Sequence, residues 1–198
     1  MRIATLILVF ILVVSCQEKE AANYTETIKK HQYELNLLYN DQTQSPLKPE
    51  DLKNFSKLDF FPIDSAYRVK ALFQPITNGE VITLPTNTDR TSLYLEYALL
   101  QFSLNGIQEE LTVYKSQELG EGNYLFLPFT DPTNGIESYG AGRYIDLRFM
   151  EPIEQEIWLD FNLSYNPYCA YNKDFSCPIP PANNNLNNPI NAGVKKYH

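Results

Sequence analysis

The residues best suited to chemistry lie in a stretch near the C-terminus that is rich in proline, asparagine and tyrosine. Cys169 and Cys177 stand there with seven residues between them. The stretch is too polar and too rich in proline to form a helix or a strand. Loops held in one shape by a rigid scaffold are where binding and catalytic groups tend to lie. The stretch therefore predicts the place of a site without naming a reaction.

The two thiols have two interpretations. An even pair of cysteines in an oxidising compartment favours a disulfide between Cys169 and Cys177, which would stiffen the loop. The alternative is a redox or nucleophilic thiol, which needs a base or a cation beside one sulfur. The only histidines are His31 and His198, so the sequence disfavours a Cys–His pair. It also disfavours zinc, which needs further ligands besides two thiolates. We expect neither a metal nor a cofactor.

A second set of polar side chains would suit a ligand. Asp131 stands in an Asp-Pro-Thr-Asn-Gly turn, Arg143 follows Gly-Ala-Gly into a predicted strand, and Asp160 ends another strand. If these segments meet at one end of a sheet, they enclose a space for a small polar ligand. The alternative is a buried arginine–carboxylate pair that satisfies the backbone of an irregular loop. The candidate ligand-binding residues are Asp131, Tyr139, Arg143, Asp160, Asn162, Tyr165, Asn166 and Asn185.

Aromatic residues are abundant, with 14 tyrosines and 11 phenylalanines. A tyrosine ring has a flat apolar face and a polar tip, which suits sugar or peptide ligands. Strands also prefer aromatic residues, so most of these rings are expected to pack in the core.

The N-terminus predicts where the protein is located. An apolar run from Ile3 to Val14 has the length of a secretory signal and is too short to span a bilayer. It ends in Val13-Val14-Ser15-Cys16, which resembles the bacterial lipobox, so Cys16 is the expected lipidation site. Gln17 follows rather than aspartate, and the sorting rule for such proteins then implies the outer membrane. We expect a protein of the cell envelope, anchored by lipid and facing the periplasm or the cell surface.

Charge limits the choice of partners. The formal net charge is −8, and the chain has no basic cluster beyond Lys29-Lys30 and Lys195-Lys196. Binding to nucleic acid needs lysine and arginine gathered on one face, so nucleic acid is disfavoured as a partner. The expected partners are the membrane, through the lipid, and an unknown small polar ligand.

The elements that must position these residues follow from hydrophobic periodicity. Apolar positions recur at helical spacing over residues 24–39, and Pro49 is placed to open a short helix. Asn105-Gly106 predicts a tight hairpin, because both residues accept a positive φ. Pro189 is placed to open a last short helix through Gly193. Seven strands are predicted at residues 67–73, 80–84, 92–104, 108–115, 123–129, 143–149 and 155–161.

These elements predict a mainly β fold, either a β-sandwich or a partly open β-barrel. An N-terminal helix precedes the strands, and a long irregular cover follows them and is expected to lie across one end of the sheets. The domain plan is a lipoprotein signal peptide (1–15), the lipidated cysteine with a flexible tether (16–23) and one domain (24–198).

Several short segments occur in a characteristic order. They are Phe126 to Gly135, Glu137 to Tyr144, Asp160 to Asn162, Tyr165 to Pro167, Cys169-Ala170 and Cys177-Pro178. In this order they resemble the bacterial family called domain of unknown function 1684, from Asp59 to the C-terminus. The resemblance implies a fold boundary and a choice of site residues, but it implies no activity, substrate or cofactor.

Three functions are consistent with these residues. The leading hypothesis is a lipid-anchored extracytoplasmic module that binds a small ligand or acts as an accessory protein, because no nucleophile–base pair or metal cluster stands out. The second is an enzyme of unrecognised class, a hydrolase or a thiol-dependent enzyme, that uses Arg143, Asp160, Tyr165 and a cysteine. The third is a purely structural envelope protein. A free thiol or a lowered cysteine pKa would favour the enzyme.

Overall fold

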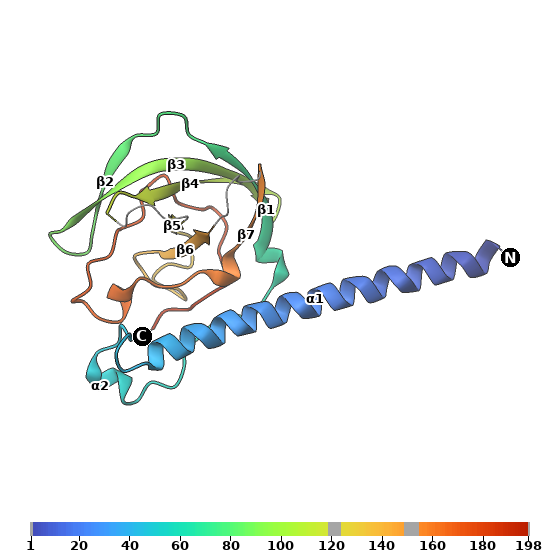
Figure 1. Ribbon diagram of the computed structural model, residues 1–198, viewed down its shortest axis with the longest axis horizontal. Helices are drawn as coiled ribbons and strands as arrows, with labels where there is room; N and C mark the ends of the chain where they lie inside the picture. The colour runs from blue at the N-terminus through green and yellow to red at the C-terminus, as the bar shows by residue number, and fades with distance from the viewer. Residues whose placement is uncertain (1, 119–123, 149–154, 198) are drawn as a thin grey trace.

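Seven antiparallel strands form one strongly curled sheet in the described part of the chain (Figure 1). The computed structural model describes residues 2–118, 124–148 and 155–197, with side chains from residue 21 onward. The strands follow the order β6-β5-β4-β3-β1-β7, and β2 pairs with the first part of β3. Their bounds are Arg68–Pro75 (β1), Val81–Pro85 (β2), Thr91–Leu104 (β3), Ile107–Ser116 (β4), Tyr124–Phe129 (β5), Arg143–Arg148 (β6) and Glu156–Asp160 (β7).

The prediction of a mainly β fold is confirmed, and the structure decides between its two forms. The strands make a single half-barrel, so the partly open barrel is right and the two-sheet sandwich is wrong. The predicted hairpin joins β3 to β4, with φ of 51° at Asn105 and 80° at Gly106. A bulge in β3 between Glu96 and Ala98 shifts the register against β4. Because side chains alternate along a strand, the bulge changes which residues face the main core.

The irregular cover after β7 has two parts. Its second part fills the interior of the half-barrel, where Leu186, Ile190 and Ala192 join the main apolar core. In Figure 1 this segment runs inside the curve of the sheet. The sequence had suggested instead that the cover lies across one end of the sheets. The expected last helix is also absent, because residues 189–193 are irregular and Gly193 has a φ of +77°. Two short 3₁₀ turns, Phe161–Leu163 (η2) and Tyr168–Ala170 (η3), belong to the first part.

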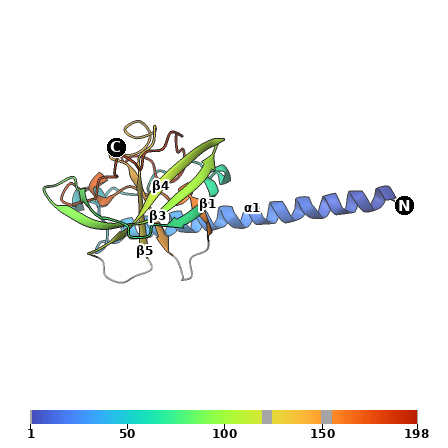
Figure 2. The ribbon, with the colours of Figure 1, turned by 90° about the horizontal axis from the view of Figure 1, so that it is seen from above.

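Helix α1 (Arg2–Asn40) is longer than predicted. Residues 17–23, expected to form a flexible tether, continue the helix, since glutamate, lysine, glutamine and alanine are strong helix formers. Its C-terminal half packs on the domain through Ile28 and Tyr39, whereas its N-terminal end projects away from the sheet (Figure 2). The short helix α2 (Pro49–Leu52) begins at the predicted proline. No helix among the described residues is long and apolar enough to cross a membrane.

Candidate functional site

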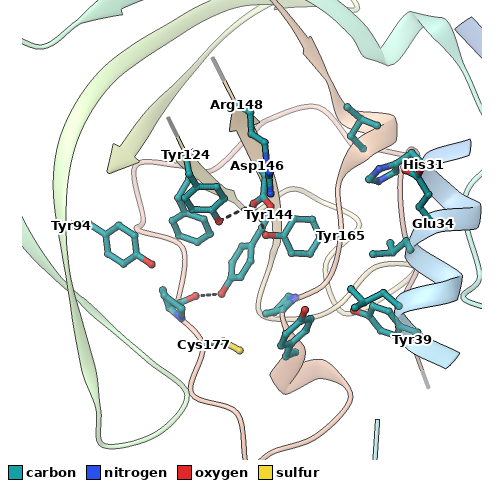
Figure 3. A pocket seen from close by; sticks show the side chains of 17 residues that line it. His31, Glu34, Tyr39, Tyr94, Tyr124, Tyr144, Asp146, Arg148, Tyr165 and Cys177 are labelled. Atoms are coloured by element: carbon teal, nitrogen blue, oxygen red, sulfur yellow. Dashed lines mark hydrogen bonds between the residues drawn. The ribbon is translucent and has the colours of Figure 1, made fainter. Parts of the chain in front are cut away.

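A cavity of about 710 Å³ lies between α1, the first part of the cover and strands β3, β5 and β6 (Figure 3). Helix α1 forms one wall, strands form the opposite wall, and the cover supplies the rest. Aromatic rings and apolar side chains make up most of the lining. The lining residues are His31, Glu34, Leu35, Leu38, Tyr39, Tyr94, Tyr124, Phe126, Tyr144, Asp146, Arg148, Leu163, Tyr165, Pro167, Tyr168, Cys177 and Pro178.

Strand alternation separates the cavity from the main core. On β6, Ile145 and Leu147 face the core, and Tyr144, Asp146 and Arg148 line the cavity. The same division holds on β5, since side chains of adjacent residues point to opposite faces of a sheet. This alternation of Tyr144, Asp146 and Arg148 was visible in the sequence, but sequence reasoning missed it.

Asp146 is the centre of the polar contacts in the cavity. Its Oδ1 accepts hydrogen bonds from the Tyr124 hydroxyl at 2.9 Å and from the Tyr165 hydroxyl at 2.5 Å. Two donors on one oxygen hold the carboxylate in a fixed direction. Tyr165 comes from the cover and Tyr124 from β5, so Asp146 links the strand wall of the cavity to the cover. Tyr144 also donates its hydroxyl to the backbone carbonyl of Pro178 in the cover.

Two pairs of aromatic rings in the cavity pack edge to face, whereas Tyr94 stacks on Phe126 at an interplanar angle of 29°. The Phe126 and Tyr144 centroids are 4.7 Å apart with an interplanar angle of 75°. Tyr144 and Tyr165 are 5.8 Å apart at 89°. Edge-to-face packing of this kind is favourable, and it turns ring faces in different directions around the space.

Burial sets the protonation states in the cavity. Desolvation raises the pKa of Tyr94 to about 12, and it raises the pKa values of Tyr144 and Tyr165 well above the ordinary value of tyrosine. These phenols are neutral hydrogen-bonding groups at neutral pH. Burial also lowers the pKa of His31, so its imidazole is neutral there as well.

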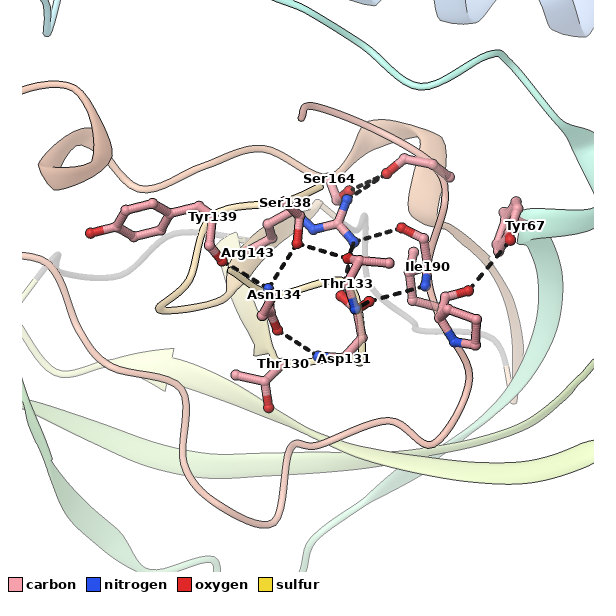
Figure 4. A network of polar contacts seen from close by, with 12 residues as sticks. Tyr67, Thr130, Asp131, Thr133, Asn134, Ser138, Tyr139, Arg143, Ser164 and Ile190 are labelled. Atoms are coloured by element: carbon pink, nitrogen blue, oxygen red, sulfur yellow. Dashed lines mark hydrogen bonds and ion pairs between the residues drawn. The ribbon is translucent and has the colours of Figure 1, made fainter. Parts of the chain in front are cut away.

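A second polar cluster surrounds Arg143 on the opposite face of β6 (Figure 4). Its guanidinium donates to Asp131 Oδ2 at 2.9 Å, to the Ala192 carbonyl at 2.6 Å and to the Ile190 carbonyl at 2.8 Å. Asp131 Oδ1 accepts from the backbone N–H of Thr133 and of Ile190. Both charged side chains are 0% exposed. Burial lowers the pKa of Arg143, and the Asp131 charge opposes this shift. Both terminal nitrogens of the guanidinium have partners within the fold, whereas the buried Nε has no hydrogen-bond partner among the described residues.

Local backbone geometry places Arg143 at the start of β6. Gly142 has a φ of +95°, and a Cβ there would lie 2.6 Å from the Phe129 carbonyl oxygen. Only glycine fits this close approach in the left-handed region. The guanidinium then reaches across to the second part of the cover. The arrangement matches the structural alternative, in which the ion pair satisfies the backbone of an irregular segment.

Asp160 and Asn162 do not join Arg143, contrary to the expected convergence. Asp160 caps η2 by accepting from the Asn162 N–H at 2.9 Å, and it accepts from the Tyr24 hydroxyl of α1 at 3.1 Å. The Asn162 side chain donates to the Asp64 carbonyl. These contacts fasten α1 and the segment before β1 to the cover.

The two cysteines are free thiols, so the predicted disulfide is wrong for this structure. The Cys177 sulfur instead accepts a hydrogen bond from the Cys169 backbone N–H at 3.2 Å. The Tyr139 hydroxyl lies 3.8 Å from the Cys169 sulfur. A side-chain hydrogen bond between the two thiols lowers the pKa of Cys169 to about 7, and the same thiol–thiol bond raises the pKa of Cys177.

A comparison of the sequence with models of known protein families identifies the family of the chain. The family described as protein of unknown function DUF1684 matches residues 53–195. The chain belongs to the DUF1684 family. The match includes the half-barrel and the cover. It excludes the α1 wall of the cavity, so that wall is specified by residues outside the matched segment.

One solved structure resembles this DUF1684 protein closely. The solution NMR structure of an uncharacterized protein from Haloarcula marismortui is 36% identical and has a TM-score of 0.71. The similarity covers 89% of this chain and 96% of the other. No curated protein matches the chain. The comparisons establish family and fold, and the function of the DUF1684 protein must be argued from its own residues.

The eight candidate ligand-binding residues have different surroundings. Asp131 and Arg143 meet in the buried cluster, and Asn166 is also fully buried. Asn185 is exposed and accepts from the Thr130 hydroxyl. Tyr165 is the one candidate that lines the cavity. Sequence reasoning therefore found two cavity residues in the cover, the ligand candidate Tyr165 and the thiol Cys177, and missed the strand residues. The described residues hold no group of three or more His, Cys, Asp or Glu placed to bind a metal ion.

Proposed function

We propose that this DUF1684 protein is a lipid-anchored module of the cell envelope that binds a small ligand in the cavity beside Asp146. The observation that carries the proposal is an open space of about 710 Å³ with an apolar, aromatic lining and a few fixed polar groups. Ligand sites commonly have volumes of about 300–1,000 Å³ and this kind of lining. The Arg143 cluster, by contrast, has no exposed side chain with which to meet a ligand.

The arrangement favours binding over acid–base catalysis. The Asp146 carboxylate is held by two phenols, and among the described residues no histidine is hydrogen-bonded to it or to a thiol. General acid–base catalysis needs a titratable group within reach of the reacting atom and a pKa near the working pH. The phenols have raised pKa values and serve as neutral donors.

A cavity-filling variant tests the proposal. Leu38 lines the cavity, and Leu37, on the same helix, is 52% exposed. The purified protein is screened for thermal stabilisation by a panel of sugars, amines, amino acids and short peptides. We expect one class to raise the melting temperature of the wild type and of Leu37→Trp but not that of Leu38→Trp. Stabilisation that survives in Leu38→Trp, or no stabilisation by any class, would contradict the proposal.

The envelope location rests on the N-terminal segment. Cys16 stands in the lipobox position, and Gln17 after it favours the outer membrane. We expect Cys16→Ala to move the protein from the membrane fraction to the soluble fraction of the producing cell, and its mass to lack the lipid. Unchanged membrane association with no lipid on the wild-type chain would overturn the anchor.

A second candidate function is thiol chemistry at the edge of the cavity. Cys169 and Cys177 are free, the pKa of Cys169 is lowered to about 7, and Cys177 lines the cavity. A thiolate at neutral pH is a nucleophile. We expect iodoacetamide to modify Cys169 with a pH midpoint near 7. Cys177→Ala should move this midpoint upward, because it removes the thiol that donates a hydrogen bond to the thiolate. A midpoint at the ordinary cysteine value in the wild type would exclude this candidate.

A further inference from the structure

The geometry points to an organic ammonium group as the part of the ligand that enters the cavity, such as the head of a quaternary or primary amine. This inference rests on the proposed function, because it names the chemistry of the ligand for the same site. It follows from three features of the lining: its charge, the engagement of its hydroxyl groups and the direction of its rings.

The charge of the lining favours a cation. Asp146 and Glu34 supply two carboxylates, and Arg148, which is exposed, supplies one cation. His31 is neutral at neutral pH because burial lowers its pKa. No ion pair joins Arg148 to Asp146 among the described residues. The net charge of the lining is therefore negative, which attracts a cation and opposes an anion.

Three of the six tyrosines that line the cavity use their hydroxyl protons within the protein. Tyr124 and Tyr165 donate to Asp146, and Tyr144 donates to the Pro178 carbonyl. A sugar would need several free donors and acceptors, and these three phenols have already used their protons. Their rings line the cavity, and the negative face of an aromatic ring attracts a cation.

The second oxygen of Asp146 completes the arrangement. Both phenols donate to Oδ1, and no hydrogen bond from the described residues reaches Oδ2. Tyr144 and Tyr165, whose rings stand at 89° to one another, lie beside this carboxylate (Figure 3). A fixed carboxylate among differently directed rings is the arrangement that recognises ammonium groups in aromatic cages. A neutral ligand or an anion would not interact favourably with both the carboxylate and the faces of the rings.

A matched pair of probes separates charge from shape. Choline carries a quaternary ammonium group, and 3,3-dimethylbutan-1-ol has the same shape with a neutral carbon in place of the nitrogen. Calorimetric titration of the full-length protein is expected to show choline binding at least about tenfold more tightly than the neutral alcohol. Asp146→Asn should weaken choline binding by about tenfold or more, because the charge is lost. Asp174→Asn, an exposed carboxylate in the cover, is the control and should bind choline as the wild type does.

Each other outcome overturns the inference in a defined way. Equal affinities for choline and the alcohol would mean that the cavity recognises the shape of the ligand and not its charge. Choline binding that is unchanged in Asp146→Asn would place the cation elsewhere. If choline fails but another class from the panel binds and Leu38→Trp blocks it, the ammonium inference falls and the proposed function stands. If no class binds, both fall.

Discussion

Strand β6 carries two polar sites on its two faces, and they differ in their access to open space. Arg143 faces the main core, where its contacts to Asp131 and to two carbonyls are closed from solvent. Asp146 faces a cavity, where one carboxylate oxygen is engaged and the rings around it border open space. A closed cluster holds the chain together, whereas an open one can meet a ligand. Because successive side chains of a strand point to opposite faces of the sheet, Arg143 and Asp146 of the same strand lie in separate environments.

The largest effect is expected at the closed site. Arg143→Met leaves the Asp131 carboxylate buried without its partner, which costs about 3–5 kcal/mol of the free energy of unfolding. Arg148→Met, on the same strand but exposed, should change that free energy by no more than about 0.5 kcal/mol. Chemical denaturation of both variants measures the difference. Equal stabilities would show that the buried pair has no structural role and would break the comparison.

A smaller loss is expected where the cover joins the sheet. The buried Asn184 side chain donates to the carbonyls of Thr112 and Pro128 and accepts from the Thr112 N–H. It bridges β4 and β5, which pair at Tyr114 and Phe126. Asn184→Ala leaves these backbone groups without partners, at a cost of about 1–3 kcal/mol. The exposed neighbour provides the control, because Asn185→Ala loses one hydrogen bond at the surface. Similar melting temperatures for the two variants would refute this account of the cover.

The open site should tolerate a change with less loss of stability. Tyr165→Phe removes one donor from Asp146, which keeps the hydrogen bond from Tyr124. We expect a loss of about 1 kcal/mol in the free energy of unfolding. The free energy of ligand binding should change by more than the free energy of unfolding, because the carboxylate is held in its direction by one phenol instead of two. Urea denaturation with ligand titration checks both, and a loss as large as that of Arg143→Met would place Tyr165 among the structural residues.

The smallest effect concerns pH. Burial lowers the pKa of His31, so the unfolded chain binds the proton more readily than the folded one. The His31 contribution to stability is fully present above the ordinary histidine pKa of about 6.5, and it is lost as pH falls through that value toward the lowered one. The melting temperature of His31→Gln should therefore fall less than that of the wild type as the pH is lowered from 7.5 to 5.5. A steeper fall of the melting temperature in His31→Gln than in the wild type would reverse the sign.

The elements of the fold could be predicted because their signals are local. Alternating apolar residues indicated all seven strands, Asn105-Gly106 indicated the hairpin, and Pro49 indicated the short helix. The bulge between Glu96 and Ala98 had no such signal, and it decides which face of β3 meets the main core. The position of the cover inside the half-barrel depends on contacts between distant segments, so periodicity does not reveal it.

The site was harder to predict for a related reason. Polar residues in the turns and the cover, such as Asp131, Asn162 and Asn166, drew attention because they looked free. An irregular segment packed inside a sheet must satisfy its own backbone, and these side chains do so. Asp146 lay within the predicted strand 143–149 and was not singled out. Its role depends on Tyr165, which is close to it only in the folded chain.

Ring-labelled tyrosine NMR tests the central claim most directly, because it reports on both sites at once. Tyr124, Tyr144 and Tyr165 report on the cavity, and Tyr67, which donates to the Pro189 carbonyl beside the Arg143 cluster, reports on the closed site. On titration with choline, the signals of the three cavity tyrosines should shift together and the Tyr67 signal should stay in place. Shifts at Tyr67 without shifts at the cavity, or no shift in any of the four, would contradict the assignment of the cavity as the binding site.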